Sequence, residues 1–408
     1  MRHKSMRSGG VTVVLAIALL LAACDGGTKS GGGAGQPGKT ATGAPISVGL
    51  INMEDAPTGS FPEFRRAAEA AVAYVNGELQ GAGGRPIHLE KCTTTGAPET
   101  SQACANKLRS KGVVAVIGGV DVGAAASLPV LEQAKIPYIS TSPSLGDELT
   151  SDDAFMLTGG TGGDLLGQAA YAIDTLHVKK VGIVYADLPG LLSTAVEATK
   201  QVLQKKGVTD VKLVAAKADS RDLTPALSQV NEGNPEVIVS VFPAQGCARI
   251  MQAKESLDIK AKMFYPGACG EQSVFDSAGT GAEGAYFGTG FFPYTDRTNP
   301  DVATYLDKSK EKPSVLGQAG FSAVMDLRAL LSAPGAAMSA DSLIARLKTT
   351  KSEPGFMTHD YTCDAKQVEL LSAICNSNIR MLQYKKRTFT DVVGDWVNGA
   401  PLVKLFTG

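Results

Sequence analysis

From Ile46 onward the chain alternates short apolar segments with amphipathic ones, and this alternation limits the fold more than any other feature of the sequence. The segment Val113–Gly118 is an almost continuous apolar run, which is typical of a strand buried on both faces of a parallel sheet. Earlier apolar residues recur at three- and four-residue steps, as on one face of a helix: Phe61, Phe64, Ala68, Ala71, Val75 and Leu79. The pattern predicts an α/β fold.

This strand–helix pattern runs twice along the chain. After a Ser/Pro-rich loop that follows Tyr138–Ser140, it restarts with a predicted helix at Gly163–Leu176 and a buried strand at Lys180–Ala186. A length of 408 residues is enough for two lobes with separate cores, so we predict two doubly wound α/β lobes. Ligands bind beyond the carboxyl ends of such strands. The loops to inspect therefore follow Asn52, Gly118, Ile139, Ala186, Phe242 and Tyr265.

The N-terminal segment indicates export. Three basic residues, Arg2, Lys4 and Arg7, precede an apolar run of 13 residues, Val11–Ala23. Because a membrane-spanning helix needs about 20 residues, this run reads as a secretory signal. It ends Leu21-Ala22-Ala23-Cys24, which resembles the lipobox of bacterial lipoproteins and implies cleavage before an acylated Cys24. The alternative is an ordinary signal peptide, residues 1–23, with a coincidental cysteine.

The segment after Cys24 predicts a tether. Eight of the 20 residues from 25 to 44 are Gly, and almost nothing in them is apolar enough to bury. Such a composition is typical of a flexible coil. We therefore expect residues 24–44 to link a lipid on the outer face of the cell membrane to a body that begins near Ile46.

The cysteine count is odd until Cys24 is set aside. The other six of the seven cysteines fall into three close pairs along the chain: Cys92 and Cys104, Cys247 and Cys269, Cys363 and Cys375. An exported protein can keep disulfides, so we predict three in this pairing. The alternatives are buried free thiols in one or two pairs, or a reactive Cys247 at a helix start.

Composition and motifs exclude several classes of protein. A formal net charge of −1 argues against a basic nucleic-acid-binding surface, and removal of the signal peptide makes the chain more acidic. The sequence has no G-x-S-x-G, H-E-x-x-H or P-loop motif. Gly279–Gly284 matches G-x-G-x-x-G but precedes a strand-like segment instead of opening a helix, so the dinucleotide reading fails. We expect no enzymatic activity, cofactor, metal or nucleic-acid partner; an envelope hydrolase is the least favoured alternative.

A series of short motifs resembles one known family. In order they are Ala71-Val72-Ala73-Tyr74-Val75-Asn76, Gly83-Gly84-Arg85-Pro86-Ile87, Ala103-Cys104-Ala105-Asn106-Lys107-Leu108, Val114-Ala115-Val116-Ile117-Gly118 and Ile136-Pro137-Tyr138-Ile139-Ser140-Thr141-Ser142. Their order and spacing are similar to those of type I periplasmic-type solute-binding proteins, and most of all to the leucine/isoleucine/valine-binding branch of branched-chain amino acid ABC transport.

The resemblance implies two lobes that close on a ligand about a three-strand hinge. We place the crossings near Gly162, Gly290 and Glu353, which gives a first lobe of residues 45–162 and 290–352 and a second of 163–289 and 353–408. The resemblance also implies a monomeric, lipid-anchored receptor that delivers a small molecule to the permease of an ABC importer. A sensor that reports the ligand to a signalling partner without transport is the alternative.

In the first lobe, family members bind the carboxylate of an amino acid through hydroxyls and backbone N–H groups. At the corresponding loop this chain reads Gly119-Val120-Asp121-Val122-Gly123, with no hydroxyl. Asp121 is a candidate for a cationic group, or else a helix N-cap. Ser142 and Ser144 in the next loop are candidates, and the aromatic expected after the first strand falls at Ser60 or Phe61.

In the second lobe the family uses an acidic side chain for the ammonium group. The expected position falls in Pro266-Gly267-Ala268-Cys269, where no carboxylate stands, and Glu271 is the nearest. The family's Tyr-Gly after Asp187 is Pro189-Gly190 here; Phe242 and Gln245 follow another strand. We retain Asp187, Phe242 and Gln245 as candidates, with plain core packing as the alternative for Phe242. Since a buried ammonium without its carboxylate costs several kcal/mol, a neutral or differently charged small polar molecule fits this site better.

Overall fold

The computed structural model describes residues 40–54, 56, 59–144, 146–188, 192–333 and 338–406, all within one compact unit. The predicted signal peptide, Cys24 and most of the tether lie outside the described residues, as do Pro189 and Gly190. Among the helices of the described part, none is long and apolar enough to cross a membrane.

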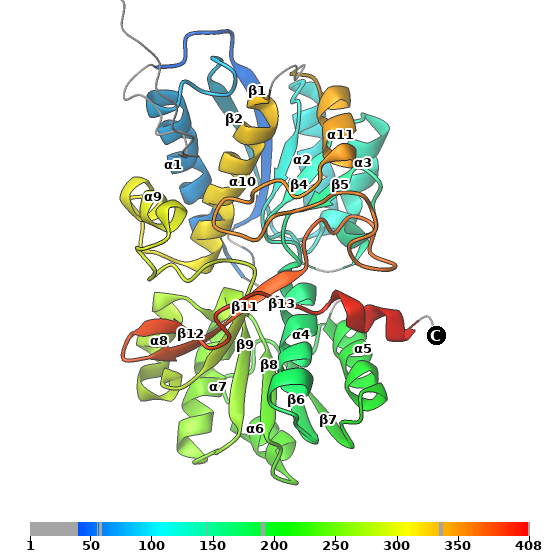
Figure 1. Ribbon diagram of the computed structural model, residues 1–408, viewed down its shortest axis with the longest axis vertical. Coiled ribbons are helices and arrows are strands. Elements are labelled where there is room, and N and C mark those ends of the chain that lie inside the picture. Colours follow the sequence, from blue (N-terminus) through cyan, green and yellow to red (C-terminus); the bar gives the residue numbers. More distant parts are fainter. Residues whose placement is uncertain are drawn as a thin grey trace, which may run out of the picture. The chain divides into compact units, whose positions relative to one another are not determined.

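The first sheet contains five parallel strands in the order β2-β1-β3-β4-β5. Figure 1 shows it in the upper half of the molecule, with helices beside it. The strands are β1 (Ile46–Met53), β2 (Ile87–Thr94), β3 (Val116–Gly118), β4 (Tyr138–Ser140) and β5 (Ala154–Met156). The helices are α1 (Pro62–Glu78), α2 (Pro98–Ser110), α3 (Leu128–Gln133), α9 (Pro300–Lys308), α10 (Val315–Ser332) and α11 (Ala340–Thr349). We call this sheet and these helices the first lobe.

Helices α1 and α10 make the closest helix pair of the first lobe. The predicted apolar face of α1 is confirmed where it meets the core, because Phe64, Ala68, Ala71 and Val75 are fully buried. On the facing helix, Gly320 approaches the α1 backbone so closely that an added Cβ would lie 2.0 Å from the carbonyl oxygen of Phe64. The pairing of α1 and α10 therefore depends on a residue without a side chain.

The second sheet has the order β12-β11-β10-β9-β8-β6-β7, with β13 paired to β11. Strands β6 to β10 run parallel, whereas β11, β12 and β13 pair antiparallel. The strands are β6 (Lys180–Ala186), β7 (Asp210–Ala216), β8 (Val237–Val241), β9 (Lys262–Pro266), β10 (Tyr286–Thr289), β11 (Asn378–Lys385), β12 (Thr388–Asp391) and β13 (Val397–Asn398). The helices are α4 (Gly160–Ala170), α5 (Leu192–Lys205), α6 (Thr224–Asn231), α7 (Ala244–Ser256) and α8 (Gln272–Ala278). We call this sheet and these helices the second lobe.

The prediction of a two-sheet, doubly wound α/β fold is confirmed, with some local differences. Strand β5 and helix α8, which contain three and seven residues, were not predicted. The helix expected at Gly163 starts at Gly160 and ends in a π-helical turn at residues 171–175. Short elements escape pattern analysis because three to seven residues do not establish a period.

The third connection between the lobes comes later than expected. The backbone N–H groups of Met156 and Cys375 bond to the carbonyls of Ala373 and Met156, so the tail still pairs with the first sheet at these residues. Strand β11 in the second sheet begins at Asn378. We therefore place this crossing between residues 375 and 378 instead of near Glu353, and the exact limits of the lobes stay a prediction.

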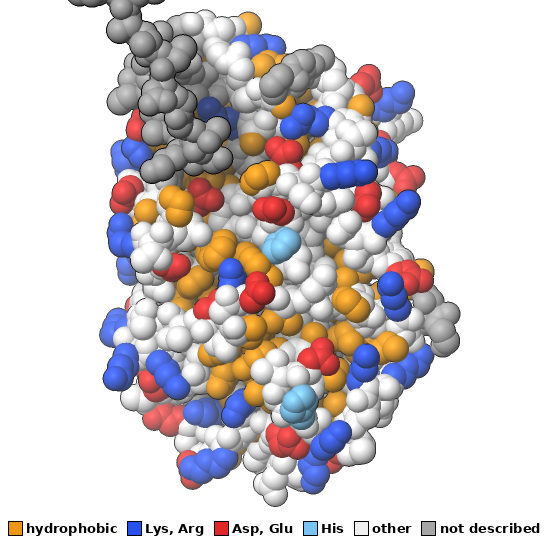
Figure 2. All heavy atoms as spheres, viewed as in Figure 1, with side chains coloured by type: hydrophobic (Ala, Val, Ile, Leu, Met, Phe, Trp, Pro, Cys, Tyr) orange, Lys and Arg blue, Asp and Glu red, His pale blue; other side chains and the backbone are white. Residues whose placement is uncertain are grey.

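An aromatic cluster surrounds this connection. The guanidinium carbon of Arg380 on β11 lies 4.6 Å from the ring centroid of Phe292 and 4.4 Å from that of Trp396. Figure 2 shows hydrophobic side chains gathered on this face over the middle of the molecule, where Figure 1 places β11 and β13. The cation–π contacts join the segment after β10 to the C-terminal strands.

The structure contains three disulfides in the predicted pairing. Their Cα–Cα distances are 5.5 Å for Cys92–Cys104, 6.0 Å for Cys247–Cys269 and 4.3 Å for Cys363–Cys375. The first joins β2 to α2, the second joins the start of α7 to the turn after β9, and the third closes a loop in the tail. Cys247 is thus disulfide-bonded here, in contrast to the reactive-thiol alternative.

Candidate ligand-binding cleft

A cavity of about 910 Å³ lies between the two lobes. Its walls come from the loops that follow β1, β6, β7, β8 and β9, and from the start of α10. The first lobe contributes Ala56, Gly59, Ser60, Phe61, Glu63, Arg66, Glu311, Lys312, Pro313, Ser314 and Leu316. The second contributes Asp187, Lys217, Ala218, Asp219, Pro243, Ala244, Gln245, Gly246, Arg249, Ala268, Glu271, Gln272 and Ser273. The cavity is therefore at the carboxyl ends of strands from both sheets, where ligands of doubly wound folds bind.

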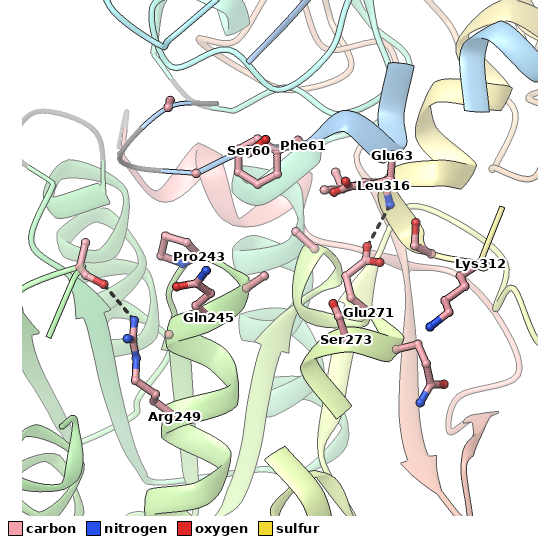
Figure 3. A pocket seen from close by; sticks show the side chains of 18 of the residues that line it. Ser60, Phe61, Glu63, Pro243, Gln245, Arg249, Glu271, Ser273, Lys312 and Leu316 are labelled. Carbon is pink, nitrogen blue, oxygen red and sulfur yellow. Dashed lines mark hydrogen bonds between the residues drawn. The ribbon is translucent and has the colours of Figure 1, made fainter. Parts of the chain in front are cut away.

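Four of the eight candidate ligand residues line this cavity. Ser60 and Phe61 do so from the first lobe, and Asp187 and Gln245 from the second. Phe61 is half-buried at the start of α1, while the side chains of Asp187 and Gln245 are exposed. Figure 3 shows Ser60 and Phe61 above the cavity and Gln245 below them, on the opposite wall.

Asp121 does not line the cavity. It is 1% exposed, and its carboxylate accepts hydrogen bonds from the Thr94 hydroxyl (3.0 Å), the Ser101 hydroxyl (2.9 Å) and the Gly123 backbone N–H (3.1 Å). Burial raises the pKa of Asp121, and these three hydrogen bonds oppose that rise. The side chain holds the turn after β3 in place, but it is not the helix N-cap of the alternative interpretation, because the helical turn Ala124–Ala126 has Gly123 as its N-cap.

Ser142, Ser144 and Phe242 also lie outside the lining of the cavity. The backbone N–H of Ser142 bonds to the Ser140 hydroxyl at 3.1 Å, and that of Ser144 bonds to Glu148 at 3.4 Å. Phe242 is 4% exposed and belongs to the hydrophobic core. Its side chain packs against α7, where a Cβ on Gly246 would lie 2.7 Å from the Phe242 Cβ.

Glu271 is the most deeply buried charged residue of the cavity wall, and sequence reasoning noted it only as the nearest carboxylate. It stands just before α8 and is 8% exposed. The backbone N–H of Leu316 in the first turn of α10 donates to Glu271 Oε1 at 3.4 Å, a bond between the lobes drawn in Figure 3. Burial raises the pKa of Glu271 to about 8, nearby Glu63 adds to the rise, and hydrogen bonds from residues 314–316 lower it.

The turn that carries Glu271 is held in place by contacts from several elements. The Gly267 N–H donates to Asp164 Oδ2 of α4 at 3.0 Å, and the Tyr294 hydroxyl donates to the Gly270 carbonyl at 3.0 Å. The Cys247–Cys269 disulfide ties the same turn to α7. Asp164 is itself buried, which raises its pKa to about 8. These contacts fix the backbone of the turn from which Glu271 extends to the cavity.

Glu63 and several basic residues were missed by sequence reasoning. Glu63 lies in the first turn of α1, where an acidic residue stabilises the helix dipole, so its sequence position suggested no other role. Arg66 pairs with Glu311 at 2.9 Å. In the second lobe Arg249 donates to the Ala218 carbonyl at 3.5 Å, and its buried Nε has no hydrogen-bond partner among the described residues. The cavity wall thus carries charges of both signs.

We found no arrangement in the described residues of three or more His, Cys, Asp or Glu side chains that would hold a metal ion. The cavity wall instead offers carboxyl groups, guanidinium and ammonium groups, hydroxyl groups, two amides and one aromatic ring. Such a set can bind a small polar molecule through hydrogen bonds and ion pairs.

Comparisons with known proteins agree with this architecture. Residues 45–386 match the family model for periplasmic binding proteins. The Leu/Ile/Val-binding protein BraC3 of Rhizobium johnstonii is 25% identical over 336 residues, which cover 79% of this chain and 89% of that protein. The substrate-binding protein LivJ of Streptococcus pneumoniae, solved in complex with isoleucine, is similar with a TM-score of 0.70 and 17% identity, covering 86% of this chain and 98% of that one.

A second solved structure has a ligand of another kind. The solute-binding protein of an ABC transporter from R. palustris, in complex with 4-hydroxybenzoate, is similar with a TM-score of 0.73 and 16% identity. The similarity covers 89% of this chain and all of that one. At these identities the structures establish the fold alone, whereas the family model spans most of the sequence. The chain described here belongs to the periplasmic binding protein family.

Proposed function

We propose that this protein is the solute receptor of an ABC importer and binds a small polar molecule in the cleft by hinge closure. The observation that supports this most is the composition of the cavity wall, which comes from loops of both lobes. A ligand that contacts both walls binds the closed form more tightly than the open form, and this difference shifts the equilibrium toward closure. The closed form would then dock on the permease.

We further propose that the ligand is not a branched-chain amino acid. The loop after β3 has no hydroxyl, and its Asp121 is used to hold the turn. Ser142 and Ser144 lie outside the cavity lining. The resemblance implied that the loop after β3 and the loop with Ser142 and Ser144 bind the carboxylate of an amino acid. Neither loop offers a hydroxyl to the cavity. The similar structures with isoleucine and 4-hydroxybenzoate indicate that this fold takes ligands of different chemistry.

A thermal-shift assay tests both statements. A ligand that binds only the folded state raises the melting temperature, by an amount that grows with its concentration over Kd. We expect micromolar leucine, isoleucine and valine to leave the melting temperature unchanged, while another small polar solute raises it. Clear stabilisation by any of the three amino acids at that concentration would overturn the ligand proposal and leave the receptor proposal intact.

We propose that the mature protein is anchored by lipid on Cys24, with residues 24–44 as the tether. These residues lie outside the described part of the chain, so the proposal rests on the sequence alone. Cells fed an alkynyl fatty acid should label the wild type, and C24A should lose the label and leave the membrane fraction. A labelled, membrane-bound C24A would rule out this anchor.

A further inference from the structure

The first turn of α10 lies against the second lobe at one edge of the cleft. Val315 and Leu316, the first two residues of this helix, are both buried. The start of α10 contacts the helical turn Gly267–Cys269 of the second lobe, and a Cβ added to the next residue, Gly270, would lie 3.5 Å from Val315 Cγ2. The two lobes are therefore in van der Waals contact at this edge.

The N-terminus of α10 has backbone N–H groups that the helix itself cannot pair. Two of them find partners within the first lobe, because the Ser314 N–H donates to the Tyr305 hydroxyl at 3.2 Å and the Gly317 N–H donates to the Ser314 hydroxyl at 2.9 Å. The Leu316 N–H donates instead to Glu271 Oε1 of the second lobe at 3.4 Å, the bond drawn in Figure 3. The second lobe thus contributes to the cap of a first-lobe helix.

The turn that presents Glu271 is fixed to the rest of the second lobe. Its Gly267 N–H donates to Asp164 of α4, and a disulfide ties the turn to α7. Rotation of the second lobe away from the first would therefore break the bond between Glu271 and Leu316 and expose the apolar contact beside it to water. Both changes cost free energy, so they favour a closed edge.

We propose that Glu271 is an interlobe latch, which caps α10 across the cleft and holds this edge closed before a ligand arrives. The inference rests on the proposed closure about the hinge, and it specifies a contact that sets how much of the empty protein is closed. A ligand that binds the closed form then binds more tightly, because its apparent Kd falls as the binding-competent fraction of the protein rises.

Two variants at this position test whether the hydrogen bond is what holds the lobes. E271A removes the acceptor, whereas E271Q keeps a carbonyl that can accept from the Leu316 N–H. E232A is the matched control, because Glu232 pairs with Lys212 within the second lobe. Amide hydrogen exchange resolved to single residues and small-angle X-ray scattering are measured on each mature protein without ligand.

We expect the Leu316 N–H to exchange about tenfold faster in E271A than in the wild type, the effect of losing one hydrogen bond. The Gly317 N–H, whose partner Ser314 belongs to the same lobe, should exchange at an unchanged rate. The radius of gyration should increase in E271A and stay at the wild-type value in E271Q and E232A.

Unchanged exchange of the Leu316 N–H in E271A would overturn the latch. Faster exchange without a larger radius of gyration, or an E271Q variant as open as E271A, would overturn it as well. If circular dichroism shows that E271A does not fold, the wild type provides the test, since a Leu316 N–H that exchanges much faster than that of Gly317 would also refute the latch. No ligand is used, so these results leave the receptor function to the thermal-shift assay.

Discussion

Replacing Glu271 by Gln should change how the stability of the empty protein depends on pH. The carboxyl group is 8% exposed, and its pKa is about 8 in the folded protein against 4.5 when unperturbed. Between these two values the folded state holds a proton that the unfolded state has lost. The stabilising contribution of protonated Glu271 is therefore largest below pH 4.5. It decreases as the pH rises above this value and is lost once the pH has passed through 8. Gln keeps the carbonyl that accepts from Leu316 and does not titrate.

The size of the effect follows from the two pKa values. One proton corresponds to about 1.4 kcal/mol per pH unit in the window where the two states differ. Between pH 5.5 and 7.5 the contribution of Glu271 should fall by about 2.5 kcal/mol, because the folded group begins to ionise near the upper end. This is a large part of the total stability of a typical protein, which is about 5–15 kcal/mol.

The assay compares urea unfolding of the mature wild type and E271Q, followed by circular dichroism at several values between pH 5.5 and 7.5. Other buried carboxyl groups, such as Asp164, titrate in both proteins, so only the difference between the two curves is used. We expect the wild type to lose stability relative to E271Q as the pH rises. Parallel curves would refute the reasoning, because they would mean that Glu271 is ionised and hydrated in the folded protein.

Three further predictions concern packing, the disulfide at the cleft and the ligand. G320A should destabilise the protein by about 1–3 kcal/mol in chemical denaturation, because the added Cβ would meet the Phe64 carbonyl. The control G77A has open space around the added Cβ and should be neutral or stabilising by up to about 1 kcal/mol. Equal effects of the two substitutions would contradict the packing of α1 on α10. The double variant C247A/C269A opens a loop of 22 residues and should lose about 3 kcal/mol; a loss under about 1 kcal/mol would show that this crosslink contributes little. Leucine, isoleucine and valine should not raise the melting temperature at micromolar concentration, and a clear rise would restore an amino-acid ligand.

The fold could be predicted because the patterns that indicate helices and strands involve residues close together in the chain. The apolar face of α1 and the apolar strand β6 are set by residues close together in the chain, and most of these residues are buried as the patterns indicate. The disulfide pairing was also accessible, since each pair of cysteines is separated by 12 or 22 residues. The third crossing was placed too early because the tail returns to the first sheet at Ala373 and Cys375, and nothing local marks that return.

The site was only partly accessible, because side-chain roles depend on neighbours distant in sequence. Asp121 was predicted to line the cleft because it follows a strand. Its carboxylate instead accepts hydrogen bonds from the hydroxyls of Thr94 and Ser101, which belong to other elements. Glu63 looked like an ordinary first-turn acid of a helix. Its relation to Glu271 arises only when α1 and the turn before α8 face the same cavity.

The position of Glu271 links ligand recognition to the contact between the lobes. Its turn is held by Asp164 and by a disulfide within the second lobe, and it reaches the first lobe through the N–H of Leu316. The Tyr294 hydroxyl adds a second bond to the same turn, at Gly270. A group that binds Glu271 therefore acts on the surface where the lobes meet.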